Sequence, residues 1–318
     1  MKQVCVEGFG DASRVHLREV AEPEPAAGEV VLALRACGLN YSDLVQREGL
    51  YPGGPRPPYV PGAEASGIVI GRSPDVTTLE LGARVMVVGR HGLQAERVAV
   101  PATRCFAPPE AMSDAEAAGF PVSFLTAYHA LTTVAHARPG EVVVIHAAAG
   151  GLGTAAVQIA KLLGLHVIAT TSTDAKRARV RALGADQVVD YDGFEAAARA
   201  HGGAAIVIES IGGDVQRQSL QILAPLGRLV MVGVTGKQAR PIDPIKLIFK
   251  SHAILGLHLE AILGQAELVG PAIAWLLAHV RTGALVIQIG HTLPLAEVRV
   301  AHELLASRQS YGKIVLVP

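Results

Sequence analysis

The stretch that decides the fold is Val142–Thr173, VVVIHAAAGGLGTAAVQIAKLLGLHVIATTST. An apolar run is followed by a cluster of small residues, an amphipathic run and a second apolar run. This order predicts a strand, a tight turn, a helix and a second strand parallel to the first. The small residues include A-x-x-G-x-x-G at Ala147, Gly150 and Gly153. In such a turn, backbone N–H groups can approach a pyrophosphate at the positive end of the helix. We therefore predict dinucleotide binding here, against the alternative of a bare structural turn.

The end of the second strand indicates which dinucleotide would bind. NAD sites usually place Asp or Glu there to accept a hydrogen bond from the ribose 2′-OH. Here the strand ends in Ala-Thr-Thr-Ser at 169–172, with no acid, and Lys176 and Arg177 follow. Hydroxyl groups beside cations suit a 2′-phosphate, which favours NADP(H). The alternative is that Lys176 and Arg177 form a solvated helix face. The nearby Asp174 is acidic, and its spacing allows it to cap the helix.

The alternation of strand and helix continues through the middle of the chain. It predicts a parallel sheet with helices on both faces, as in a doubly wound Rossmann fold. A further helix is expected around Leu268–His279. The expected strands are 142–147, 166–171, 187–191, 204–210, 228–234 and 253–259.

The first 120 residues have a different pattern, with short β-rich runs separated by proline and glycine. They predict a smaller, mostly antiparallel domain. The chain ends in another β-rich run, KIVLVP, which is expected to fold back onto that domain because it is too short to build a core of its own. We place the antiparallel domain at residues 1–121 with 282–318, and the nucleotide-binding domain at 122–281.

Composition excludes several classes of protein. Lys+Arg and Asp+Glu balance at 28 each, and there are only six Tyr, six Phe and one Trp, so no nucleic-acid partner is expected. The three cysteines are far apart, which suits a reducing cytoplasm. The N-terminus is too polar for a signal peptide. The most apolar stretch, Ala253–Val280, is interrupted by polar residues, so no spanning helix is expected, while attachment to a membrane surface stays open.

Several motifs together resemble one family over the whole chain. They are CGLNYSD (37–43), EGLYP (48–52), PYVPGAEASGIV (58–69), FLTAYHAL (124–131), HAAAGGLG (146–153) and YGKIVLVP (311–318). The chain resembles the zinc-free medium-chain dehydrogenases/reductases of the quinone oxidoreductase (zeta-crystallin) type. GFGD, RVMVVGRHG and GLHLEAILGQAELV are similar to the vesicle amine transport protein-like branch. The resemblance implies an NADP-binding Rossmann domain and a GroES-like domain built from both chain ends. It also implies a homodimer, formed through the sheet edge at AILGLHL.

The resemblance also bears on metal binding. Zinc-dependent relatives carry C-x-T/S-D and G-H-E motifs, whose Cys and His ligate the metal. This chain has Asn40 at the Cys position and Ala63 at the His position. Neither an amide nor a methyl group ligates Zn²⁺ as thiolate and imidazole do, so no metal is expected. His129, His146 and His166 are interpreted as core or surface histidines.

Without zinc, reduction of a conjugated acceptor is the favoured reaction. Hydride addition to a quinone or an α,β-unsaturated carbonyl gives a delocalised oxygen anion that water protonates, so no Lewis acid is required. One alternative is a protein that binds NADPH and acts mainly by association with a partner or a membrane. Another is a trans-acting enoyl reductase of a biosynthetic pathway.

The resemblance assigns roles at the substrate side. It places Asn40 near the nicotinamide and the substrate, against the alternative of a local turn residue. Asp43 would pin the neighbouring backbone. Tyr51 lies in the substrate-side loop, where it would donate a hydrogen bond or close the pocket. Thr126 would contact the nicotinamide end, unless its hydroxyl bonds its own helix backbone.

The remaining assignments concern the cofactor. The pyrophosphate would be held by Gly150, Gly151, Leu152 and Gly153. Ser172 and Lys176 would hold the 2′-phosphate, and Tyr191 would pack at the adenine-ribose end. Arg308 would reach the same phosphate, unless it is a surface charge. Ser210 and Gly233 end the fourth and fifth expected strands, where the cleft of such a sheet should lie.

Overall fold

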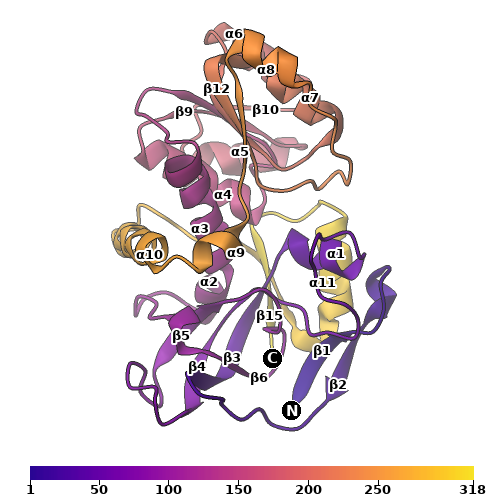
Figure 1. Cartoon of the computed structure of the whole chain (residues 1–318), viewed down its shortest axis with the longest axis vertical. Coiled ribbons are helices and arrows are strands. Elements are labelled where there is room, and N and C mark those ends of the chain that lie inside the picture. Colours follow the sequence, from indigo (N-terminus) through magenta and orange to yellow (C-terminus); the bar gives the residue numbers. More distant parts are fainter. The chain divides into compact units, whose positions relative to one another are not determined.

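The structure is a computed structural model that describes all residues from Met1 to Pro318. The chain divides into two compact units, which Figure 1 colours along the sequence. The first unit comprises residues 1–122 and 287–318, and the second comprises residues 123–286. The two ends of the chain therefore belong to the same unit.

The second unit is built on a parallel six-stranded sheet in the order β10-β9-β8-β11-β12-β13. This confirms the predicted doubly wound arrangement. The observed strands are mostly shorter than expected, because each ends where the chain leaves the sheet for a turn. They are β8 (Val142–Ile145), β9 (His166–Thr170), β10 (Gln187–Val189), β11 (Ala204–Glu209), β12 (Leu223–Met231) and β13 (Ala253–Gly256).

The strand order reverses at β8, and this reversal determines where the helices lie. The chain runs outward from β8 to β9 and β10, then crosses to β11 and continues outward to β12 and β13. Right-handed crossovers therefore require α4 (Gly151–Leu162) and α5 (Asp174–Ala182) on one face of the sheet. They require α6 (Phe194–Ala200) and α7 (Gly213–Gln221) on the other. The carboxyl ends of β8 and β11 thus form a topological switch point, where α/β sheets bind ligands.

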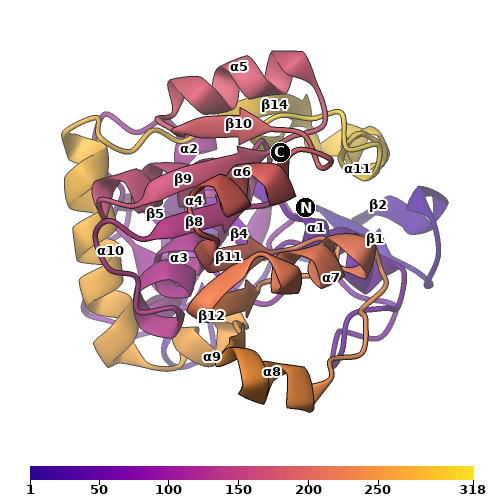
Figure 2. The same cartoon turned by 90° about the horizontal axis from the view of Figure 1, so that it is seen from above.

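The same unit carries further helices and an open sheet edge. Strand β13 has a neighbour on one side only. Figure 2 shows helix α8 at the margin of the unit. No helix of the chain combines the length and the apolarity needed to span a bilayer. The remaining helices of this part are α3 (Pro121–His129), the π-helical turn Ala130–Val134, α8 (Pro244–Lys250), α9 (Leu259–Leu263) and α10 (Ala266–Arg281), which contains the predicted helix 268–279.

The first unit is built mainly on an antiparallel sheet in the order β14-β15-β3-β4-β5-β7, with β6 also paired to β3. Strand β15 pairs with β3, so the end of the chain completes the sheet, as predicted. Strands β1 and β2 form a separate two-stranded sheet. The strands are β1 (Lys2–Val6), β2 (Val15–Glu19), β3 (Glu29–Leu39), β4 (Glu64–Arg72), β5 (Arg84–Val88), β6 (Arg97–Pro101), β7 (Cys105–Phe106), β14 (Ile289–Pro294) and β15 (Lys313–Val317). The helices are α1 (Tyr41–Arg47), α2 (Asp114–Gly119) and α11 (Val298–Ala306).

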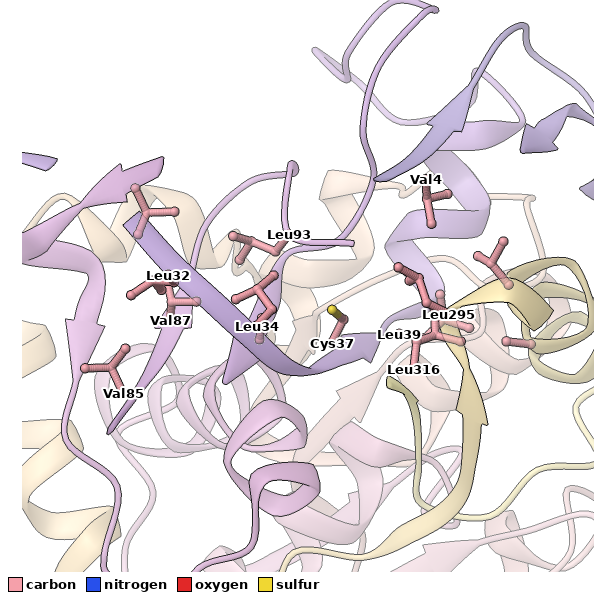
Figure 3. Close-up of a cluster of buried hydrophobic side chains, with 14 of the residues drawn as sticks. Val4, Leu32, Leu34, Cys37, Leu39, Val85, Val87, Leu93, Leu295 and Leu316 are labelled. Atoms are coloured by element: carbon pink, nitrogen blue, oxygen red, sulfur yellow. The ribbon is translucent and has the colours of Figure 1, made fainter. Parts of the chain in front are cut away.

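An apolar cluster holds this unit together, and Figure 3 shows part of it. Leu32, Leu34 and Leu39 of β3 are buried there together with Leu316 of β15 and Leu295. Burial of each such leucine contributes roughly 1.5–3 kcal/mol to folding. Packing of the first and last parts of the chain into one cluster explains why strand β15 stays in the sheet.

Candidate functional site

The predicted glycine turn lies at the carboxyl end of β8. Gly150 is the N-cap of α4 and offers no side chain to the first N–H groups of the helix, which have no partner within the helix itself. Ala147 adopts a left-handed conformation with φ of 49°. A methyl group on Gly153 would overlap the carbonyl oxygen of Ala147 and lie 2.5 Å from Cα of Ala148. The turn is therefore closely packed, and its free N–H groups together with the helix dipole suit a pyrophosphate.

A buried hydrogen-bonded chain holds this turn against the neighbouring strands. The ring of His146, directly after β8, lies 3.1 Å from the hydroxyl of Thr170 and 2.9 Å from that of Ser219. The Ser219 hydroxyl in turn donates to the carboxylate of Glu209 at 3.0 Å. Because Ser219 donates to Glu209, it accepts from His146 Nε2, which leaves Nδ1 to accept from Thr170. Burial lowers the pKa of His146 to about 3, so the ring stays neutral.

The same chain shapes the loop after β11. The second carboxylate oxygen of Glu209 accepts from the N–H groups of Ile211 at 2.5 Å and Gly212 at 2.9 Å. Burial raises the pKa of Glu209, and the backbone bonds oppose this shift. One set of side chains thus connects the ends of β8, β9 and β11 at the switch point. Sequence reasoning treated His146 as a core or surface histidine and missed its link to Glu209 and Ser219.

Tyr191 contacts both the glycine turn and His146. Its hydroxyl accepts a hydrogen bond from the N–H of Ala147 at 3.2 Å, and its ring stacks on His146 with centroids 6.0 Å apart. The side chain therefore supports the glycine turn from the β10 side. Its predicted contact with the adenine-ribose end stays a prediction.

The end of β9 bears the residues predicted to contact a 2′-phosphate. Ser172 is exposed, and Lys176 in the first turn of α5 is half-buried, which lowers the pKa of its ammonium group. The prediction that Asp174 caps the helix is wrong. Thr173 is the N-cap, and its side chain accepts from the N–H of Lys176. Asp174, one residue further on, forms an ion pair with Arg177, because a residue inside the helix can reach the side chain three positions on.

The other predicted residues of this unit lie on the carboxyl side of the sheet or in α3. Ser210 follows β11, and Gly233 lies two residues after β12. A methyl group on Gly233 would lie 4.0 Å from the carbonyl oxygen of Ser210, so the two strand ends face each other. Thr126 lies in α3 and is half-buried. The predicted contact of Thr126 with the nicotinamide end, and the alternative of a hydroxyl bonded to its own helix, stay predictions.

In the first unit, Asn40 is the centre of a charged cluster. Its amide oxygen accepts from the ammonium group of Lys313 at 2.7 Å, and its amide nitrogen donates to Glu64 at 2.9 Å. Lys313 and Glu64 also form an ion pair with each other. The Lys313 side chain is 4% exposed and that of Glu64 is fully buried. Glu64 and Lys313 each begin a strand that is mainly apolar, and both lie within the motifs PYVPGAEASGIV and YGKIVLVP, but sequence reasoning assigned neither a role.

Asp43 fixes the backbone beside this cluster. Its carboxylate accepts from the N–H groups of Asn40 at 2.8 Å and Gly62 at 3.2 Å. Burial raises the pKa of Asp43 to about 6, although these two hydrogen bonds oppose the shift. The contacts agree with the predicted role of Asp43 in pinning the neighbouring backbone.

Two predicted residues of the first unit lie outside this cluster's hydrogen bonds. Tyr51 is half-buried in the turn after α1, where its carbonyl accepts from the N–H of Gly54. Arg308 is exposed and adopts a left-handed conformation with φ of 59°, just after α11. The predicted roles of Tyr51 and Arg308 toward substrate and cofactor stay predictions.

Metal-ligating side chains are not gathered at any point of the chain. No group of three or more His, Cys, Asp or Glu side chains has an arrangement that could hold a metal ion. At the two positions where zinc-dependent relatives have Cys and His, this chain has the amide of Asn40 and the methyl group of Ala63. Of the predicted histidines, His129 is buried beside Thr133, and His166 is half-buried, 3.8 Å from Asp186.

Comparison with known proteins agrees with this architecture. The family description "Alcohol dehydrogenase GroES-like domain" matches residues 26–110, and "Zinc-binding dehydrogenase" matches residues 151–278. The synaptic vesicle membrane protein VAT-1 homolog of Homo sapiens is 32% identical over 340 positions, which cover 100% of this chain and 86% of the human protein.

Solved quinone oxidoreductases have the same fold. The enzyme from Thermus thermophilus, described also in its complex with NADPH, is 40% identical with a TM-score of 0.88 and full coverage of both chains. The Escherichia coli quinone oxidoreductase complexed with NADPH is 27% identical with a TM-score of 0.92, again with full coverage of both. The chain belongs to the medium-chain dehydrogenase/reductase family, in its zinc-free quinone oxidoreductase type near the VAT-1 branch.

Proposed function

We propose that this protein is an NADPH-dependent oxidoreductase that transfers hydride to a quinone or an α,β-unsaturated carbonyl without a metal. The observation that carries the proposal is the turn after β8, where Gly153 leaves no room for a side chain and the first N–H groups of α4 have no capping side chain. Two quinone oxidoreductases described as NADPH complexes share this fold over the whole chain.

The cofactor would be held mainly by backbone groups and a few charges. Gly150, Gly151, Leu152 and Gly153 would hold the pyrophosphate at the start of α4. Ser172, Lys176 and Arg308 would hold the 2′-phosphate. NADPH supplies a hydride, which brings a hydrogen nucleus and an electron pair to the acceptor. The remaining predicted contacts are Tyr191 at the adenine-ribose end, Thr126 toward the nicotinamide, and Ser210 and Gly233 at the carboxyl ends of β11 and β12.

On the acceptor side, Asn40 would donate a hydrogen bond to the carbonyl oxygen. This bond orients the acceptor and stabilises the negative charge that develops on the oxygen. Lys313 adds a positive charge next to the Asn40 amide. The oxygen anion formed by hydride addition is delocalised, so water protonates it and the protein need not supply a strong acid. Tyr51 would close the substrate side of the site or donate a second hydrogen bond.

The test is oxidation of NADPH and NADH by purified, EDTA-treated protein with one ortho-quinone, one para-quinone and one enal. NADPH-preferring turnover that EDTA does not affect supports the proposal. Tight NADPH binding with no turnover of any acceptor would contradict the broad quinone reductase activity. That result would favour an association role, or a biosynthetic enoyl reductase whose substrate is outside the panel.

An open edge and an exposed apolar helix in the second unit support a homodimer. Strand β13 is paired on one side only, and α8 precedes it by two residues. Ile245, Ile248 and Phe249 of α8 are 58%, 72% and 85% exposed. We propose that a second copy pairs with β13 and covers these side chains, because an unpaired edge next to exposed apolar residues favours association.

Light scattering after gel filtration tests the dimer, with the paired change Ile248→Ser and Phe249→Ser. A dimer that becomes a monomer in the variant supports the proposal. A wild-type monomer that binds anionic vesicles through the same residues would instead support attachment to a membrane surface.

The three free cysteines are consistent with a place in the reducing cytoplasm.

A further inference from the structure

The hydrogen bonds of Asn40 leave its amide only one orientation. Lys313 carries only N–H donors, so the atom 2.7 Å from its ammonium group must be the amide oxygen of Asn40. Ionised Glu64 carries only acceptors, so the atom 2.9 Å from its carboxylate must be the amide nitrogen. A flipped amide would direct N–H groups at an ammonium group and its oxygen at a carboxylate.

The two charged partners are themselves fixed in place. One oxygen of the Glu64 carboxylate accepts from Asn40 and Lys313, and the other accepts from the N–H of Val122 at 2.7 Å. All three are donors, so a carboxylate satisfies them and an amide at position 64 would not. Lys313 enters β15 directly after Gly312, which has φ of 63° and where a methyl group would overlap the carbonyl oxygen of Gln288.

Two glycines make room for these side chains. A methyl group on Gly38 would lie 2.7 Å from Cγ of Glu64, and one on Gly119 would lie 3.3 Å from Cγ of Lys313. Both charged groups are thereby buried beside Asn40. Two opposite charges in an apolar interior are usually paired, and here Lys313 donates to both Glu64 and Asn40.

We infer that Lys313 and Glu64 are positioning residues that fix Asn40 as a hydrogen-bond donor toward the acceptor of the hydride. The amide oxygen of Asn40 is engaged by Lys313, and one of its two N–H groups by Glu64. The second N–H group is the one that Asn40 can offer to a ligand. This N–H group suits a ligand with an oxygen acceptor, such as the carbonyl of a quinone or an enone. This inference rests on the proposed function.

The first experiment records the side-chain amide signals of Asn40 by ¹H–¹⁵N NMR in the wild-type protein, assigned with Asn40→Asp. One amide proton, the one bonded to Glu64, should be shifted downfield and exchange slowly with water. The other should exchange faster and should shift when an acceptor carbonyl binds. Two equivalent, fast-exchanging amide protons would overturn the inference, and this measurement requires no variant of Lys313 to fold.

The second experiment compares Lys313→Met with Lys161→Met. Lys161 also pairs with a carboxylate, that of Asp186 at 2.7 Å, but the pair is about one-third exposed. Lys313→Met should change the Asn40 amide signals and lower kcat/KM for the acceptor by about 10–100-fold, while the Kd for NADPH changes less than about threefold. Lys161→Met should leave all three unchanged.

The outcomes separate this inference from the proposed function. A wild-type protein without turnover of any acceptor contradicts the proposed function, whereas the NMR signals still decide the orientation of Asn40. The positioning role is overturned by a different result. In that case the wild type turns over an acceptor, and Lys313→Met has the same kcat/KM and the same Asn40 amide signals as Lys161→Met.

Discussion

The ammonium group of Lys313 lies 2.7 Å from the amide oxygen of Asn40, although 273 positions separate the two residues in the chain. The same ammonium group forms a buried ion pair with Glu64. Removal of one partner of a buried pair leaves an uncompensated charge, which typically costs about 3–5 kcal/mol. These contacts therefore connect the stability of the first unit to the orientation of its candidate catalytic amide.

Lys313→Met should accordingly lower the free energy of unfolding by about 3 kcal/mol. Lys161→Met, which breaks a partly exposed pair with Asp186, should lower it by less than about 1 kcal/mol. Urea unfolding at neutral pH measures both. Equal losses in the two variants would show that burial of the Lys313 pair has no special effect on stability.

The glycine turn gives a second prediction, because its glycines differ in the space around them. A methyl group on Gly153 would lie 2.5 Å from Cα of Ala148, whereas one on Gly150 would lie 3.5 Å from the carbonyl oxygen of Ala147, an ordinary contact. Gly153→Ala should therefore cost about 2 kcal/mol or more through overpacking. Gly150→Ala should change stability by less than about 1 kcal/mol. Thermal unfolding of the two variants without cofactor checks this, and a larger loss in Gly150→Ala would contradict it.

The third prediction concerns the choice of cofactor. If Lys176 holds the 2′-phosphate, Lys176→Ala removes a charge-assisted bond worth about 1.5–3 kcal/mol. The Kd for NADPH should then rise about 10–100-fold while that for NADH stays the same. Arg181→Ala is the matched control, since Arg181 is a cation in the last turn of the same helix. If Lys176→Ala raises the Kd for NADPH and the Kd for NADH equally, the contact with the 2′-phosphate lies at another residue.

The sequence predicted the sheet of the second unit because local patterns carry it. Apolar runs alternate with amphipathic runs, and the small residues at 147–153 mark the first turn. The return of KIVLVP to the first sheet could also be predicted, since so short a run has no core of its own. The N-cap residue of α5 could not be predicted from the sequence, because Thr173 and Asp174 are both good capping residues. Only the backbone conformation distinguishes them.

The polar clusters could not be predicted from the sequence, since their members are brought together only by the fold. Glu64 and Lys313 are 249 positions apart, and His146 and Ser219 are 73 apart. No local period connects such pairs. The available signal was a charged residue at the start of a mainly apolar strand, which indicates a buried partner but not which residue it is.

A buried histidine in the first unit gives a pH-dependent prediction. His302 is fully buried, and its Nδ1 lies 3.1 Å from Nη1 of Arg47. Burial, helped by the Arg47 charge, lowers the pKa of His302 to about 3. The unfolded chain, with a histidine pKa of about 6.5, binds this proton more readily. The contribution of neutral His302 to the free energy of unfolding is therefore fully present above about pH 6.5. It is lost as the pH falls toward 3.

His302→Gln tests this, because Gln keeps an acceptor for Arg47 and does not titrate. Between about pH 6 and pH 4, the unfolding free energy of the wild type should fall about 1.4 kcal/mol per pH unit more steeply than that of the variant. Urea unfolding at pH 7, 6, 5 and 4 gives the two slopes. Parallel slopes would mean that His302 is already protonated in the folded protein or titrates as in the unfolded chain.

Arg308 allows stability and cofactor binding to be separated at one position. Its φ of 59° is a conformation that glycine adopts freely and that costs other residues roughly 1 kcal/mol. Its N–H donates to the carbonyl of Leu305 at 3.2 Å, as after the end of a helix. Arg308→Gly should therefore raise stability by about 0.5 kcal/mol, because the strain disappears while the greater freedom of glycine in the unfolded chain offsets part of the gain.

If Arg308 also contacts the 2′-phosphate, Arg308→Gly should raise the KM for NADPH about tenfold and leave that for NADH unchanged. Arg308→Ala is the matched control, since alanine removes the charge but keeps the left-handed strain. It should weaken NADPH as much as the glycine variant without the gain in stability. A glycine variant that is more stable and binds NADPH as tightly as the wild type would identify Arg308 as a surface charge in a strained helix end, and Ser172 and Lys176 would then hold the phosphate without it.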